Sequence, residues 1–234
     1  MVLISARIRL VRMNVLSIAA PHQVKGLKLN SVQNNSVATT GSEKRRAQRI
    51  DQVLDAASDC FVEFGFHGAG MAKIAKRAGM SVGHIYHYFE SKEAIIAAIV
   101  DRESDAAAER FAELESIPKE ELVHVMAERA RDMVESKADA FQSALNLEIL
   151  AESQRNPQIA CILHRQDEKV RGKFKSIIAD KLGLPEADAR TEVILSLFGG
   201  LATRIVRHPE IEREMLIPLL KQIMRQILQD HAKD

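Results

Sequence analysis

The stretch MAKIAKRAGMSVGHIYHYFESKE, residues 71–93, decides the fold of this chain. Its apolar residues fall at helical spacing in two groups, one on each side of Gly79: Met71, Ile74, Ala75 and Ala78, then Val82, Ile85 and Phe89. Gly79 has the place of the residue that ends the first helix in the left-handed conformation. Two short helices joined by a turn of three or four residues that contains Gly form a helix-turn-helix. The stretch therefore predicts that motif.

The same stretch also matches the G-x-S-x-G pattern of serine hydrolases at GMSVG, residues 79–83. In those enzymes the serine lies on a sharp turn between a buried strand and a helix. No β-branched run precedes Ser81, and residues 71–78 favour a helix. We therefore expect no catalytic residue here and no enzyme, with a hydrolase as the much weaker alternative.

Composition favours an all-α fold in a reducing compartment. The chain has 234 residues, enough for one large or two modest domains, and its apolar residues recur mostly at helical spacing. It has no apolar run of about 18 residues, so no membrane span is expected. Cys60 and Cys161 both lie on apolar helical stretches. A disulfide framework is therefore not expected, and a cytoplasmic location fits.

Charge is distributed unevenly along the chain. The overall formal charge is +1, but residues 1–50 carry nine Lys or Arg against Glu43 alone. The remainder holds 24 basic and 31 acidic residues. A basic front end on an acidic body indicates an anionic polymer as partner. A solvated basic tail explains the same charges, so this alternative stays open.

The chain divides into an extension, a short helical front and a longer helical body. Residues 1–41 show no sustained period and predict a disordered basic extension. A secretory signal is a weaker interpretation, because the apolar core after Arg12 is short, and an over-long start with Met13 as a true start is another. Thr40 and Glu43 have the spacing of a capping box, and Ser91 is placed to cap the long helix that follows. We expect helices at about 43–65, 71–78, 82–88, 92–117, 118–136, 138–153, 157–182, 186–206 and 211–230.

The front part resembles the TetR family of transcriptional regulators. The residues that carry the resemblance read Ile74-Ala75-x-x-Ala78-Gly79-x-Ser81-x-Gly83-x-Ile85-Tyr86-x-Tyr88-Phe89-x-Ser91-Lys92-Glu93. The resemblance implies a homodimeric regulator, usually a repressor that a small ligand releases from a palindromic DNA operator. It implies a three-helix DNA-binding domain at 42–91 and a six-helix ligand-binding and dimerisation domain at 92–234. Ala69-Gly70, Val82 and His84 depart from the residues common in the family, which affects the expected DNA sequence preference rather than the fold.

The second short helix and the basic residues near it are the candidate DNA-binding site. A recognition helix must offer hydrogen bonds to base edges in the major groove, while lysines and arginines hold phosphates. Both tyrosines of the chain and two of its eight histidines lie between residues 82 and 88. The candidates are Arg45, Arg46, Arg49, Lys73, Ser81, Val82, Gly83, His84, Tyr86, His87, Tyr88 and Lys92. His84 and His87 are also spaced to share a metal ion, but no acidic or cysteine partner is near, so neither a metal nor a cofactor is expected.

The middle helices are expected to enclose a small-molecule effector. The candidate lining residues are Phe111, Met126, Met133, Phe141, Leu145, Cys161, His164 and Phe174. Aromatic residues are few and tryptophan is absent, so an aliphatic or mixed small molecule fits better than a caged cation. Ordinary core packing is the alternative role for each of these residues.

The last two helices are expected to pair two subunits. A stripe of small residues lies on the first, and a broad apolar seam lies on the second. The candidate interface residues are Ser196, Gly199, Gly200, Thr203, Leu220, Ile223, Met224 and Ile227. Completion of the monomer core is the alternative for both helices. The alternative function for the whole chain is a helical adaptor whose helix-turn-helix no longer binds DNA.

Overall fold

The computed structural model of the chain describes residues 41–137 and 139–229. These residues form helices and turns without a strand, which confirms the predicted all-α fold. No helix among them is long and apolar enough to cross a membrane. The predicted disordered extension lies outside the described residues except for Gly41, as does Thr40 of the expected capping box.

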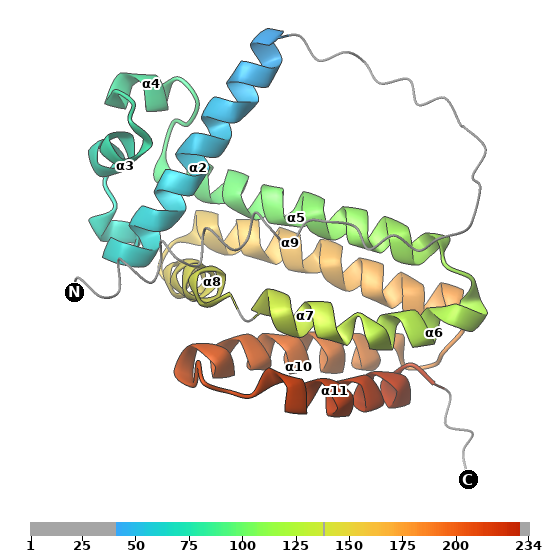
Figure 1. The fold of residues 1–234 in the computed structure, drawn as a ribbon. Coiled ribbons are helices and arrows are strands. Elements are labelled where there is room, and N and C mark those ends of the chain that lie inside the picture. The colour runs from blue at the N-terminus through green and yellow to red at the C-terminus, as the bar shows by residue number, and fades with distance from the viewer. Residues whose placement is uncertain (1–40, 138, 230–234) are drawn as a thin grey trace. The chain divides into compact units, whose positions relative to one another are not determined.

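Three helices form the front part, close to the predicted bounds (Figure 1). They are α2 (Gly41–Gly68), α3 (Met71–Ala78) and α4 (Val82–Tyr86). The regular part of α2 stops at Gly65, which has φ 70° and ψ 168°. The helix α4 is two residues shorter than expected, because the N–H groups of Tyr88 and Phe89 both bond to the carbonyl of Ile85 and close it in a tight turn.

The body contains one α-helix more than predicted. A short π-helical turn directly follows α9 (Pro157–Ser176). The elements of the body are α5 (Lys92–Ser116), α6 (Lys119–Glu128), α7 (Ala130–Lys137), α8 (Ala140–Ser153), α9, the π-helical turn Ile177–Lys181, α10 (Ala187–Arg207) and α11 (Arg213–Ile227). The predicted single helix at 118–136 is therefore wrong, because the chain breaks at Arg129 into α6 and α7. In Figure 1, α5 runs beside α9, and α10 lies beside α11.

Polar side chains cap the N-termini of three of the body helices. The Ser91 hydroxyl accepts a hydrogen bond from the Ala94 N–H at 3.1 Å, as the sequence predicted. Asp139 and Asn156 do the same for α8 and α9. Each cap satisfies a backbone N–H that has no partner within its own helix, which contributes about 1 kcal/mol per cap.

Two apolar cores fill the described chain. The first joins the front helices to the start of α5 and to three residues of α8 and α9: Leu145, Ile149 and Ile159. The second is formed by the rest of α5 with α6, α7, α9, α10 and α11. Because Ile95, Ile96 and Ile99 of α5 belong to the first core, the front part is packed onto the body rather than tethered to it. The domain boundary between residues 91 and 92 stays a prediction.

Candidate functional site

The turn between α3 and α4 has the geometry of a helix-turn-helix joint. Gly79 has φ 64°, in the left-handed region that glycine adopts without strain. The N–H of Met80 bonds to the Ala75 carbonyl at 3.0 Å, and this bond closes the end of α3. The Ser81 hydroxyl accepts a hydrogen bond from the His84 N–H at 3.2 Å, so Ser81 is the cap of α4. Since helices lie on both sides of the turn, GMSVG is not the strand-to-helix elbow of a hydrolase.

The short helix α4 turns almost all its side chains to solvent. Ile85 is fully buried and Phe89, just after the helix, is 8% exposed, so these two anchor the segment. Around them Val82, Gly83, His84, Tyr86 and His87 are exposed, Tyr86 by 53%. Tyr88 is half-buried, and its hydroxyl lies 3.3 Å from the His84 ring nitrogen Nε2. The exposed face therefore offers a phenol and two imidazoles, which can donate or accept hydrogen bonds.

Both candidate phosphate-binding lysines form contacts within the protein. Lys92 donates to the Phe66 carbonyl at 2.6 Å, and its ammonium lies 4.1 Å from the centre of the Phe66 ring. Lys73 donates to the Gly68 carbonyl at 2.8 Å and lies 3.9 Å from the centre of the Phe64 ring. Both therefore stabilise the segment that links α2 to α3. These contacts favour a structural role for both lysines, and their predicted role as phosphate ligands stays a prediction.

The predicted arginines lie on α2. Arg49 is exposed and donates to the Gln52 side chain at 2.8 Å, while Gln52 donates to the Ala78 carbonyl at the end of α3. This relay holds Arg49 near the turn that precedes α4. Arg45 and Arg46 are exposed on the first turns of α2. All three have the exposure that a phosphate contact requires.

Carboxylates of α8 hold the link between α2 and α3. The Glu148 carboxylate accepts a hydrogen bond from the Phe66 N–H at 2.8 Å. A Cβ at Gly65 would lie 3.1 Å from that carboxylate, so the close approach needs glycine here. Glu152 is 2% exposed and lies 3.3 Å from the His67 ring nitrogen Nε2 and 3.2 Å from the Arg155 guanidinium. The sequence gives no local signal for the contacts of Glu148 with Phe66 and of Glu152 with His67, because these partners are far apart along the chain.

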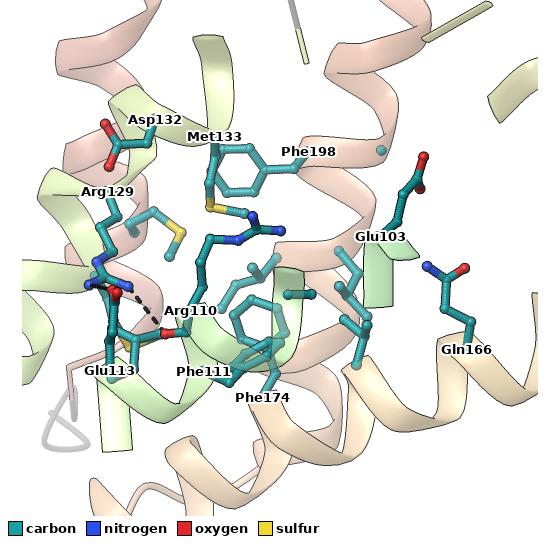
Figure 2. A pocket seen from close by; sticks show the side chains of 18 residues that line it. Glu103, Arg110, Phe111, Glu113, Arg129, Asp132, Met133, Gln166, Phe174 and Phe198 are labelled. Carbon is teal, nitrogen blue, oxygen red and sulfur yellow. Dashed lines mark hydrogen bonds and ion pairs between the residues drawn. The ribbon is translucent and has the colours of Figure 1, made fainter. Parts of the chain in front are cut away.

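A cavity of about 610 Å³ opens between the body helices (Figure 2). Of the eight predicted lining residues, the structure brings four together there: Phe111, Met126, Met133 and Phe174. The Phe111 and Phe174 rings meet edge to face, with their centres 4.9 Å apart. Further apolar walls come from α10 and α11, which the sequence assigned to pairing: Ile194, Leu195, Phe198, Gly199 and Met224.

The other four predicted residues do not line this cavity. Leu145 is buried in the first core, beside the front helices. Cys161 and His164 are exposed on α9, and Phe141 is half-buried on α8. On α9 the lining residues are Gln166, Val170 and Phe174, four apart, so Cys161 and His164 fall on a different face.

Charged residues also line the cavity, and sequence reasoning missed them. They are Glu103, Arg110 and Glu113 of α5, Arg129 between α6 and α7, and Asp132 of α7. Arg129 donates to the Glu113 carboxylate at 2.7 Å. Glu103 accepts a hydrogen bond from the Gln142 side chain of α8. Charged residues on helices usually face solvent, so no pattern in the sequence marks these as lining residues.

The predicted dimer-interface residues of α10 and α11 differ in their exposure, and only some of them lie on the surface. Ser196, Gly199 and Gly200 are exposed on α10, and a Cβ added at either glycine would meet open space. Thr203 and Ile227 are half-buried, and Ile223 is 36% exposed. Leu220 and Met224 are buried in the second core, which favours the alternative of core completion for these two, and their place at a dimer interface stays a prediction. Leu219, which belongs to the predicted apolar seam of the last helix, is 60% exposed. The sequence did not single out Val193 and Met215, whose side chains are 51% and 69% exposed on the same two helices.

The described residues show no group of three His, Cys, Asp or Glu side chains that could hold a metal ion. Cys60 is buried, and this burial raises the pKa of its thiol. A thiol with a raised pKa is a poor nucleophile and a poor metal ligand at neutral pH.

Comparison with known proteins gives relatives that match about half of the chain. Residues 53–99 match the sequence model of the bacterial regulatory proteins of the tetR family. The HTH-type transcriptional regulator UidR of Escherichia coli K12 is 41% identical over 113 residues, which are 48% of this chain and 55% of UidR. The HTH-type transcriptional repressor Rv1474c of Mycobacterium tuberculosis is 33% identical over 119 residues, 51% of this chain and 58% of that protein. The chain thus spans just over half the length of these curated relatives.

Solved structures resemble the chain over more of its length. The structure of Salmonella enterica GusR covers 77% of this chain and 95% of its own, with a TM-score of 0.60 and 28% identity. FadR of Bacillus subtilis, solved with stearoyl-CoA, covers 76% of this chain and 97% of its own, with a TM-score of 0.62. At 20% identity that second likeness shows the fold alone. Residues 53–99 of this chain are therefore similar to the helix-turn-helix segment of the tetR family of bacterial regulatory proteins.

Proposed function

We propose that the protein is a homodimeric, ligand-responsive DNA-binding transcription regulator, most simply a repressor that a small molecule releases from a palindromic operator. Supporting this are the family match of residues 53–99 and relatives named as transcription regulators, one of them a repressor. The observation that carries the proposal is α4. It is capped by Ser81, anchored by Ile85, and exposes nearly every other side chain.

The exposed face of α4 suits base reading in the major groove. Val82 can contact a thymine methyl, while Tyr86 and His87 can hydrogen-bond a base edge or a phosphate. Gly83 has no atom within 4 Å of where a Cβ would lie, so a base can approach the backbone closely. Arg45, Arg46 and Arg49 on α2 would follow the phosphate backbone.

Exposed apolar residues support pairing of two chains through α10 and α11. Val193 of α10 and Leu219 of α11 are more than half exposed, and α10 also exposes Gly199 and Gly200. Apolar side chains gathered on one surface usually mark an interaction site, and small residues let a second helix approach closely. Two chains would present two α4 helices to half-sites about one turn of DNA apart, which suits a palindromic operator.

The α8 helix offers a path from the cavity to the DNA-reading part. At its first turn the Gln142 side chain donates to Glu103, which lines the cavity. Two turns further, Glu148 accepts from the Phe66 N–H beside α3. A ligand that changes the Glu103 contact would bias the position of α8 and hence of the segment that carries α4. Such a ligand weakens DNA binding by the same free energy with which it prefers the altered arrangement.

The direct test is selection of bound sequences from random DNA, followed by gel-shift titration of the selected fragment. The proposal expects a saturable complex with a palindrome. Tyr86→Ala and His87→Ala should weaken binding to that fragment by about tenfold each, as the loss of one base or phosphate contact implies. Lys76→Ala, on an exposed position of α3, serves as the control. A chain that selects no sequence would favour the adaptor alternative, which none of the relatives described above supports.

A further inference from the structure

The cavity of the body holds a guanidinium that has no ionic partner. Arg110 lines it from α5, and Figure 2 shows its side chain extending toward Met133 and Phe198. Within the described part of the chain, Arg110 forms no side-chain hydrogen bond or ion pair. Its backbone carbonyl accepts from Arg129 at 3.2 Å, which helps to fix this turn of α5.

The other charged residues of the cavity are already bonded or point elsewhere. Arg129 is neutralised by Glu113 at 2.7 Å. Glu103 accepts the hydrogen bond from Gln142, and in Figure 2 Asp132 points away from Phe198 and from the centre of the cavity. Among the described residues no carboxylate pairs with Arg110, so it supplies a positive charge without an ionic partner next to the space that a ligand would fill.

The walls around Arg110 are apolar. Phe111 and Phe174 are 7% exposed and Phe198 is 3% exposed, and all three line the cavity. Packing an apolar group of a ligand on these rings is favourable, because the apolar surfaces of the rings and of the ligand both leave water. The volume of about 610 Å³ lies in the range of sites for drug-sized ligands.

Solvent exposure explains how the protein tolerates an unpaired cation in this place. Arg110 is exposed in the open cavity, so its guanidinium keeps its water while the site is empty. A ligand that packs on the three phenylalanines would cover it and remove that water. Removing water from an unpaired charge is costly, whereas a carboxylate can accept two parallel hydrogen bonds from the guanidinium and compensate for the loss.

We infer that the effector is an organic carboxylate with an apolar body, anchored by Arg110 through its carboxylate and by the phenylalanine walls through its apolar part. The effector role rests on the proposed function, because a releasing ligand presupposes DNA binding. The preference of the cavity for negative charge does not depend on DNA, and it is measured without it.

The test is calorimetric titration of the full chain with three probes that share one apolar body: 4-phenylbutanoate, 4-phenylbutan-1-ol and 4-phenylbutan-1-amine. The carboxylate should bind at least about tenfold more tightly than the alcohol, as hydrogen bonds to charged groups imply, and the amine should bind most weakly. Equal binding of the three, tighter binding of the amine, or binding of none would overturn the inference.

Variants then assign the preference to Arg110. Arg110→Gln should abolish the advantage of the carboxylate over the alcohol, and Arg110→Lys should keep part of it because one charge remains without the planar fork. Arg165→Gln, which removes a guanidinium from an exposed position of α9 that does not line the cavity, should leave the advantage in place. An advantage that survives Arg110→Gln contradicts the inference. Thermal melts of each variant show whether the fold is kept, and DNA selection separately reports whether the proposed regulator function fails.

Discussion

The Glu148 carboxylate of α8 accepts a hydrogen bond from the backbone N–H of Phe66 at 2.8 Å, although 82 positions separate the two residues in the sequence. This bond ties the body of the protein to the segment that precedes α3. Gly65 lies beside it with a positive φ and no side chain, so the carboxylate can come close to the backbone. The contact gives a physical route by which changes in the body reach the helix-turn-helix.

Glu148→Ala should destabilise the protein by about 2 kcal/mol, because it leaves the Phe66 N–H without its acceptor. Glu148→Gln keeps an acceptor oxygen and should cost less than half of that. Urea unfolding of both variants measures the difference. If the alanine and glutamine variants unfold at the same urea concentration as the unmodified protein, the bond does not stabilise the joint.

Two glycines at the ends of α3 should respond to substitution with opposite signs. Gly79 has φ 64°, where a side chain is strained, so Gly79→Ala should cost about 1 kcal/mol. Gly70 caps the start of α3 with φ −69° and open space for a Cβ. Gly70→Ser should therefore stabilise the protein by a few tenths of a kcal/mol, since serine is a better cap. Thermal unfolding of the pair checks this, and a stable Gly79→Ala variant would refute the assigned turn.

The salt dependence of DNA binding should separate Arg49 from Lys92. Affinity for DNA falls as salt rises, so the slope of log affinity against log salt is negative. Neutralising a residue that contacts a phosphate reduces the magnitude of this slope by about 1. Arg49→Gln should show this decrease. Lys92→Met should instead lower the stability of the free protein, because Lys92 donates to the Phe66 carbonyl, and should leave the slope unchanged. A reduced slope with full stability in Lys92→Met would restore its role as a phosphate ligand.

Acid should loosen the attachment of α11 to α6 and α7. A hydrogen bond from Lys221 lowers the pKa of Glu128, and one from Arg131 lowers the pKa of Glu214. Groups with a lowered folded pKa stabilise the protein above their ordinary value, here 4.5, and lose that contribution as pH falls through the folded pKa. The melting temperature should therefore stay level from pH 7 to about pH 5 on account of these groups, and decrease below that.

Variants test whether these two carboxylates cause the decrease. Glu128→Gln and Glu214→Gln should each reduce the decrease of the melting temperature below about pH 5, which is the acid limb of the plot of melting temperature against pH. Glu109→Gln removes an exposed carboxylate of α5 that forms no ion pair with a described residue, and should leave the limb unchanged. An unaltered acid limb in both Glu128→Gln and Glu214→Gln would show that other groups set the acid response.

A charge on α11 should separate the two subunits of the proposed dimer. Leu219 is 60% exposed on α11, so Leu219→Arg should not disturb the core but should block an apolar interface. Sedimentation velocity should then show a monomer. Leu150→Arg is the matched control, because Leu150 is 52% exposed on α8. Dimers that persist in Leu219→Arg would place the interface elsewhere.

Local patterns predicted most of the fold but not its breaks. The bounds of α3 and α5 and the start of α9 follow from apolar spacing, from caps such as Ser91, and from glycine, which are all features of neighbouring residues. The predicted end of the α9 helix at 182 was wrong, because α9 ends at Ser176 and a π-helical turn follows. The break at Arg129 was missed because a tertiary contact accompanies it, in which Arg129 reaches back to the Arg110 carbonyl and to Glu113 of α5. Apolar spacing continues through the break, so the sequence favours one helix there.

The candidate sites were predictable to the extent that their residues are apolar or strictly local. Phe111 and Phe174 were found because aromatic residues on amphipathic helices face inward. Arg110 was missed because a charged residue on a helix is normally assigned to solvent. Lys92 was assigned to phosphate binding because nothing nearby in sequence indicates that the Phe66 carbonyl is within its reach. Contacts between distant segments set these roles.

The most direct test of the central claim is the stoichiometry and footprint of the purified protein on the palindrome that it selects from random DNA. The account predicts two chains per site, protection of two half-sites centred about one helical turn apart, and binding that weakens steeply with salt. Addition of 4-phenylbutanoate should reduce the occupancy of that site. Binding of a single chain without sequence preference, or no binding at any salt concentration, would contradict the account.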